Sequence, residues 1–315
     1  MLPTITHRLM MAAAIALGTL SWWLIFPKLL AADGSAGISL MDARAGLWLA
    51  GVMLLVFGLP ALVSAIYVGA AGNPLSGIFT VGFALMILAG LGGSAQGLLI
   101  RQQSWASSAG GGVFVKLEIE LLLWAAAWCL LMFLMRRFRT KVRDRLVPRR
   151  LKTPYSASAQ RLSEEDTPKF VLHVTPIVAG LLCAGIGWLL CMAMIQNAAG
   201  GQVIGAILLA FTIGSLTARI ALPTGNVVFL VLSPLLAGFV AYAHAAVVHS
   251  GASGTDIIGL LHRGALIGPA MTLPIHWASA GMVGVATGIG LAQAIDRVRY
   301  GEFEAAASQS DAKAG

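Results

Sequence analysis

Long runs of apolar residues alternate with short polar segments along almost the whole chain. Each run has about 20 residues, the length that an α-helix needs to cross about 30 Å of hydrocarbon. The runs cover residues 9–30, 45–71, 77–100, 117–135, 170–195, 203–222, 227–248 and 275–295. The pattern therefore predicts an all-α integral membrane protein with about eight transmembrane helices.

The first run has a second interpretation. Arg8 precedes it and the small residues Gly34 and Ala36 follow it, as in a secretory signal peptide. The apolar stretch, however, continues through Trp22 to Phe26, beyond the usual hydrophobic core of a signal peptide. We therefore predict a first membrane helix, with a cleaved signal peptide as the alternative.

The composition agrees with a membrane protein. Hydrophobic residues make up 58% of the 315 residues and charged residues only 11%, and the mean hydropathy is +0.84. These values exclude a soluble enzyme and a disordered chain. Cys129, Cys183 and Cys191 all lie within apolar runs without zinc-type spacing, so we interpret them as small core residues.

The net charge of +8 is explained by membrane topology rather than by nucleic-acid binding. Nine of the 21 lysines and arginines lie between Arg136 and Lys152, directly after an apolar run. Basic residues accumulate in cytoplasmic segments, and an N-terminus inside puts 16 of them on the cytoplasmic side and five outside. The prediction is a plasma (inner) membrane protein with both termini in the cytoplasm and no nucleic-acid partner.

The basic segment also predicts a contact with lipid, because each charge beside a helix attracts an anionic leaflet by about 1 kcal/mol. The residues expected to contact anionic headgroups are Arg136, Arg137, Arg139, Lys141, Arg143 and Arg145. The segment that follows, up to residue 168, is polar and serine-rich, which is typical of a flexible linker.

Two Gly-Asn dipeptides suggest an internal duplication. A Trp-Ala pair begins 51 residues after each asparagine, at Trp124 after Asn73 and at Trp277 after Asn226. Two four-helix halves that begin and end on the same side would be parallel repeats, a symmetry known among transporters. Chance is the alternative, because Gly-Asn is a common turn dipeptide.

These observations divide the chain into a first four-helix membrane half (1–135), a basic cytoplasmic loop and linker (136–168), a second four-helix half (169–299) and a disordered tail (300–315).

One stretch of the second half does not fit a simple span. Residues 264–295 carry no Asp, Glu, Lys or Arg, are too many for one straight helix across the bilayer, and include Pro269 and Pro274. We expect residues 257–273 to be interfacial or re-entrant.

Ionisable side chains near the spans are candidates for function, because they are expensive inside a bilayer. They gather at the predicted outer boundary: Lys116, Glu118, Glu120, His244, His249, His262, Arg263 and His276. Lys116 and Glu120 are i,i+4 neighbours that are able to pair, whereas Glu118 faces elsewhere. The alternative is that all three side chains are solvated among the lipid headgroups. We also expect no acidic residue deep in any of the spans.

His276 begins the last run, and small residues, among them Gly284 and Gly288, follow it at intervals of four. Such a stripe lets another helix approach closely, so His276 should face protein. With His244 it is a candidate metal ligand, since imidazole binds zinc, copper and iron. No HExxH pattern supports this, and a hydrogen-bonding histidine between helices is the favoured interpretation. The cofactor stays undetermined.

Residues 251–254, Gly-Ala-Ser-Gly, resemble the GxSG segment of rhomboid intramembrane proteases, which pair this serine with a histidine on a later helix. His276 follows Ser253 by only 23 residues, too few for an intervening span and turn. We therefore interpret these residues as a loop of small residues.

Three functions are compatible with the sequence. A small-solute transporter or permease-like subunit with a polar site at the outer boundary is favoured, because of the two four-helix halves and the glycine content. A structural or cofactor-holding subunit of a larger membrane complex, with partner subunits or as a homo-oligomer, is the alternative. An intramembrane metal-dependent or acid-base enzyme comes third, because no complete catalytic motif is present.

Overall fold

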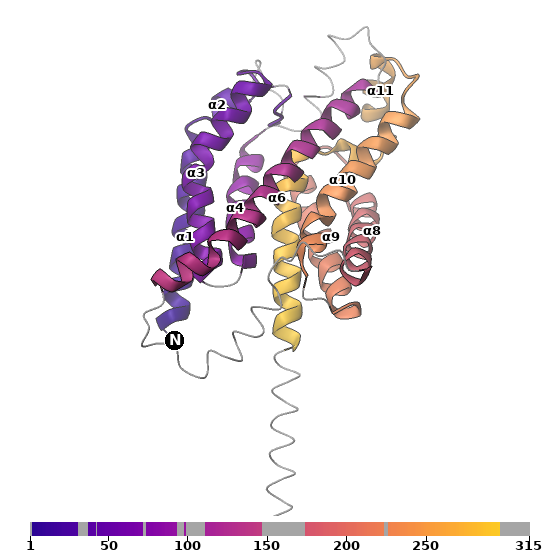
Figure 1. Cartoon of the computed structure of the whole chain (residues 1–315). Helices are drawn as coiled ribbons and strands as arrows, with labels where there is room; N and C mark the ends of the chain where they lie inside the picture. The colour runs from indigo at the N-terminus through magenta and orange to yellow at the C-terminus, as the bar shows by residue number, and fades with distance from the viewer. Residues whose placement is uncertain are drawn as a thin grey trace, which may run out of the picture.

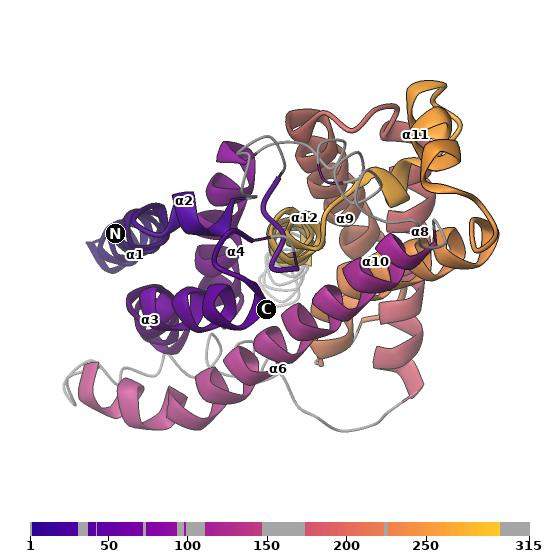
Figure 2. The same cartoon turned by 90° about the horizontal axis from the view of Figure 1, so that it is seen from above.

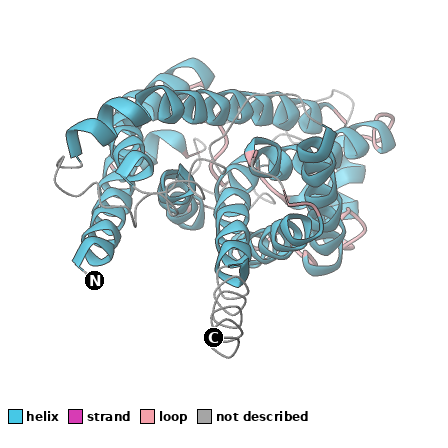
Figure 3. Ribbon diagram, turned by 60° about the horizontal axis from the view of Figure 1, so that its bottom comes forward, coloured by secondary structure: helices cyan, strands magenta, loops and turns pink. Residues whose placement is uncertain are grey.

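Seven helices among the described residues are long and apolar enough to cross a membrane. The computed structural model describes residues 2–30, 37–41, 43–71, 74–92, 98, 111–146, 174–223 and 226–296. The seven are α3 (Leu47–Ala71), α4 (Pro74–Leu91), α6 (Gly112–Leu146), α8 (Val174–Met194), α9 (Gly200–Ala221), α10 (Val228–Val248) and the helix Pro274–Asp296. The all-helical expectation is confirmed for the described residues, which contain no strand (Figure 3).

The eighth expected span corresponds to α1 (Leu2–Trp23), which is not among the seven. Thr6, His7 and Arg8 lie in its first turns, so its apolar part is short. The helix nevertheless packs against α3 and α4 and runs beside α3 through most of its length (Figure 1). The short helix α2 (Phe26–Leu29) follows it.

The helix Pro274–Asp296, which we call the central helix, is enclosed by other helices (Figure 2). It begins with α12 (Pro274–His276), continues through the π-helical turn η3 (Trp277–Gly281), and packs against α4, α6, α9 and α10. Every residue from Gly268 to Ala286 is buried. An apolar helix that faces protein on all sides needs closely fitting neighbours, since lipid supplies no hydrophobic force between helices.

Glycines provide that fit. Gly284 lies against the backbone carbonyl of Leu208, and Gly288 lies against the carbonyl of Thr212 on the same face of α9. A side chain at either glycine would collide with the backbone of α9. The expected stripe of small residues after His276 is therefore confirmed as a helix contact.

The segment expected to be interfacial or re-entrant has two parts. The helix α11 (Gly254–His262) comes first, and a turn with Gly264 at φ 63° ends it. The 3-10 turn η2 (Gly268–Met271) then enters the interior, where Gly268 lies against the carbonyl of Ile195. Irregular backbone thus lies buried in protein directly before the central helix, as is required of irregular backbone at membrane depth.

One boundary differs from the sequence prediction, and the hypothesis of two repeats stays open. α6 has 35 residues and ends at Leu146, so the start of the predicted cytoplasmic loop at residue 136 is helical. Lipid thickness limits the apolar run, but the basic residues that follow are good helix formers. The two parallel repeats are not confirmed, and Asn73, one of the residues that suggested them, lies outside the described residues. The tail at 300–315 and the linker at 147–168 also lie outside them.

The glycine contacts generate a prediction with a control on the same helix. Gly288→Ala should lower the apparent melting temperature of the detergent-solubilised protein, because overpacking costs about 1–3 kcal/mol. Gly290 has open space around its Cβ position. Gly290→Ala should leave stability unchanged or raise it by up to about 1 kcal/mol, since alanine is the better helix former. Equal shifts for the two variants would contradict the packing.

Candidate functional site

Glu120 is completely buried, although the sequence suggested a place among headgroups. It lies on the face of α6 that also buries Leu117, Trp124 and Trp128, at helical spacings of three and four. The span of α6 begins at Gly112, so this carboxyl group lies about 12 Å along the span. Glu120 is therefore enclosed by protein within the apolar part of α6, toward the end at which this helix begins.

The carboxyl oxygens of Glu120 accept three hydrogen bonds. Ser39 donates its hydroxyl to Oε2 over 2.5 Å, and the Met41 backbone N–H approaches the same oxygen at 3.4 Å. The Trp124 indole donates to Oε1 at 3.4 Å. Because a buried polar group is costly without partners, these donors are what permits Glu120 to lie in the interior.

Two of these donors come from residues 37–41, which we call the plug. Ile38 and Ser39 are each 1% exposed, and Ile38 packs against Gly92 at the end of α4. The plug therefore lies between α4 and α6 at the end of the helices where α2 and α11 are also found (Figure 1). Glu120 attaches this segment to the membrane-spanning helices.

A second buried group centres on Thr272, between η2 and the central helix. The Trp277 indole donates to its hydroxyl oxygen at 2.6 Å, and that hydroxyl donates to the Pro269 carbonyl at 2.7 Å. The Tyr242 hydroxyl of α10 donates to the Thr272 carbonyl at 3.0 Å. Glu120 is close enough to Tyr242 to interact with it electrostatically. These bonds satisfy backbone groups that the irregular segment leaves free.

His276 is 1% exposed and has only one of its two ring nitrogens engaged. Nδ1 accepts the Leu273 backbone N–H at 3.0 Å, so in the neutral ring Nε2 carries the hydrogen. Nε2 is buried and has no hydrogen-bonding partner among the described residues. A metal at Nε2 would require that hydrogen on Nδ1, which already faces the Leu273 N–H. This geometry does not favour His276 as a metal ligand.

One hydrogen bond sets the relative height of the two groups. The Trp128 indole donates to the carbonyl of Ala278 in the π-helical turn at 3.0 Å. Glu120 precedes Trp128 by eight residues and His276 precedes Ala278 by two, which correspond to about 12 Å and 3 Å of helix. Both helices start at the plug end, so both groups lie on that side of the Trp128 bond. We call them the polar layer: Ser39, Glu120, Trp124, Tyr242, Thr272 and His276.

The other candidates from the sequence do not join this layer. Lys116, His244, His262 and Arg263 are exposed, and Glu118 and His249 are half-buried. The His249 ring lies 6.2 Å from that of Phe114, and burial, with a smaller contribution from His244, lowers the pKa of His249. Within the described residues, no three His, Cys, Asp or Glu side chains are arranged to hold a metal ion.

Ser253 has a structural role. Its hydroxyl accepts the Asp256 backbone N–H at 3.3 Å, and the Asp256 carboxylate accepts the Ser253 backbone N–H at 2.8 Å and its hydroxyl at 2.6 Å. This is a capping box at the start of α11. The geometry accounts for the serine of the Gly-Ala-Ser-Gly sequence without proteolytic chemistry.

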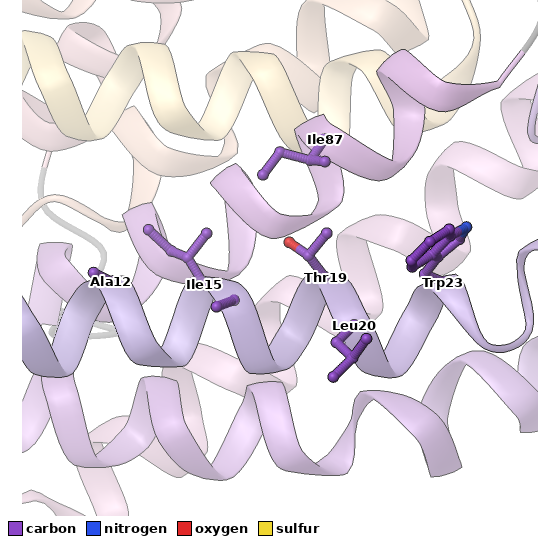
Figure 4. Close-up of a pocket in the computed structure, with 7 residues that line it drawn as sticks. Ala12, Ile15, Thr19, Leu20, Trp23 and Ile87 are labelled. Carbon is purple, nitrogen blue, oxygen red and sulfur yellow. The ribbon is translucent and has the colours of Figure 1, made fainter.

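A shallow apolar groove of about 520 Å³ lies between α1 and α4 (Figure 4). It is lined by Ala12, Ile15, Ala16, Thr19, Leu20, Trp23 and Ile87. None of these residues belongs to the polar layer, so the groove and the layer are separate features.

Comparisons with models of known protein families, with curated proteins and with solved structures found no match.

The Glu120 network predicts the effect of removing one donor. Ser39→Ala should destabilise the protein by about 1–3 kcal/mol, because a buried acceptor loses its partner. Ser21→Ala removes a hydroxyl that is exposed and bonds only within α1, and should change stability by less than about 0.5 kcal/mol. Thermal unfolding in detergent measures both, and similar shifts would refute the Ser39 interaction.

The capping box predicts a pH dependence at α11. The hydrogen bonds from Ser253 lower the pKa of Asp256 below its ordinary value of 3.8. The cap should therefore hold at neutral pH and be lost as the pH falls below 3.8, through the lowered pKa. Protection factors from hydrogen exchange of the α11 amides measure this. Ser253→Ala should lower protection already at neutral pH, whereas Ser250→Ala should not.

Proposed function

We propose that this multi-pass membrane protein is a small-solute transporter or permease-like subunit whose functional centre is the polar layer. Full burial of Glu120 within a membrane-spanning helix is the observation that carries the proposal. Ionisable residues inside a membrane are rare and mark solute or proton pathways, because the cost of burying them must be offset by function.

The backbone beside the layer also supports transport. The 3-10 turn η2 lies directly before the central helix, and a π-helical turn follows the first three residues of that helix. Discontinuous helices of this kind form substrate sites in transporters, since freed backbone groups can bind a solute. His276 Nε2 adds a buried donor at the same end of the central helix.

The plug acts in this proposal as the outer gate. Glu120 holds it through Ser39 and Met41. A proton, or a solute that donates hydrogen bonds to the same carboxyl oxygens, competes with both plug donors and weakens the closure. Binding at the layer and opening toward the outside are then coupled through one carboxyl group.

The orientation belongs to the same proposal. The start of α1 and the last parts of α6 and α9 lie at the end of the bundle opposite the plug (Figure 1). These parts of the helices carry Arg8, Arg136, Arg137 and Arg219. Basic residues mark the cytoplasmic side. We therefore place both termini in the cytoplasm of a cell with the protein in its plasma (inner) membrane, and the plug outside.

The gate is tested by chemical accessibility. In a Cys129→Ala background, Ile38→Cys should react slowly with a membrane-impermeant maleimide, because position 38 is buried. Adding Glu120→Gln should accelerate labelling about tenfold for each 1.4 kcal/mol of plug stability that is lost. Glu118→Gln, a half-buried carboxylate on the same helix, is the matched control and should leave the rate unchanged. Equal rates in all three proteins would contradict the gate.

Transport itself is tested in proteoliposomes. Stopped-flow light scattering with glycerol and urea, and a trapped pH dye for protons, should show a flux above that of protein-free vesicles. Glu120→Gln should alter this flux and Glu118→Gln should not. If the folded, monodisperse protein moves neither glycerol, urea nor protons, the result contradicts the proposal that it transports small solutes.

The second candidate is a structural subunit of a larger membrane complex. The close glycine contacts of the central helix favour it, because a core of this kind is rigid. Partner subunits retained through mild detergent purification, together with the lack of any flux, would favour this role over transport.

A further inference from the structure

We propose that the end of α6, residues 136–146, is an interfacial helix that binds anionic phospholipid headgroups. This proposal requires only that the protein lies in a membrane, and it does not depend on transport. The apolar part of α6 ends at Phe138, and the helix continues to Leu146, about 12 Å further. Seen from above, this part of α6 lies at the periphery beside α3 (Figure 2).

Helical register gives the extension an apolar face. Phe138, Val142 and Leu146 recur at intervals of four and lie within an arc of about 80° at 100° per residue. The Phe138 side chain is 39% exposed. The face continues the apolar surface of the membrane-spanning part, so the extension need not leave the bilayer surface.

Basic positions flank this face on both sides. On the same register, Lys141 and Arg145 lie on one side of it and Arg139 and Arg143 on the other, whereas Asp144 lies on the opposite face of the helix. Arg136 and Arg137 are exposed at the start of the extension. Six basic residues and one acidic residue therefore occupy positions 136–145.

This arrangement suits an anionic membrane surface. An apolar stripe with basic residues along its edges can lie at the boundary between acyl chains and headgroups, with the long side chains reaching the phosphates. Each basic residue contributes about 1 kcal/mol at an anionic leaflet. A nucleic acid or an acidic protein would match the charges but would leave the apolar stripe without a role, so the lipid surface is the occupant that fits both features.

The test uses the full-length protein. Lys141→Gln, Arg143→Gln and Arg145→Gln are combined in one variant, and the control combines Lys28→Gln, Arg44→Gln and Arg263→Gln. The control loses the same charge from three exposed residues near the plug end. Native mass spectrometry counts the phosphatidylglycerol and phosphatidylcholine molecules retained from mixed micelles, at low and high salt.

Wild type and control should retain phosphatidylglycerol in preference to phosphatidylcholine, and the α6 variant should lose at least two thirds of that preference, about a threefold reduction. High salt should weaken retention, because it screens exposed charges. Equal losses in control and α6 variant would overturn the assignment, as would a wild type without preference. Displacement of the lipid by millimolar inorganic phosphate would show a free-phosphate site instead and would also overturn it.

A second variant tests the apolar face separately. Phe138→Ser combined with Val142→Ser keeps every charge but removes two residues of the stripe. It should also retain less phosphatidylglycerol, while its thermal unfolding in detergent without anionic lipid should resemble that of the control. Undiminished retention would overturn the interfacial geometry, since binding would then depend on charge alone. Binding of an acidic soluble protein in place of lipid would overturn the choice of partner.

Discussion

Close backbone contact around the central helix is the constraint on which the rest of the structure depends. Gly284 and Gly288 bring this helix against carbonyl groups of α9, and Gly281 brings it against Pro234 of α10. Lipid does not drive apolar helices together, so the fit between surfaces must do so. Once the helix is enclosed, the irregular segment before it is also removed from lipid. That enclosure is what allows Thr272 and His276 to be polar at this depth.

The same enclosure determines how polar groups are satisfied. Thr272 receives the indole of Trp277 and the hydroxyl of Tyr242, and Glu120 receives donors from the plug. In both cases a membrane helix is bonded to a non-helical segment. Hydrogen bonds therefore connect the helices at the end where the plug lies, and glycines bring the central helix into contact with α9 and α10.

Local patterns predicted much of the fold. Runs of apolar residues located the seven helices, because lipid thickness imposes a length on each of them. The small residues that follow His276 at intervals of four correctly predicted that His276 faces protein. This prediction was possible because all these residues lie on one helix. The burial of Glu120 was not predictable in this way, because its partners Ser39 and Met41 are about 80 residues distant in sequence. The end of α6 at Leu146 does not follow from the length of its apolar run, because the helix continues through the basic residues beyond that run.

The continuity of α6 links the two ends of the molecule. Glu120 and Leu146 belong to one helix without an internal proline, so about 39 Å of stiff helix separates the Glu120 carboxyl group from the basic end. A stiff rod transmits tilt. A change in the tilt of α6 at its basic end would therefore also move the Glu120 carboxyl group and the plug residues that donate to it.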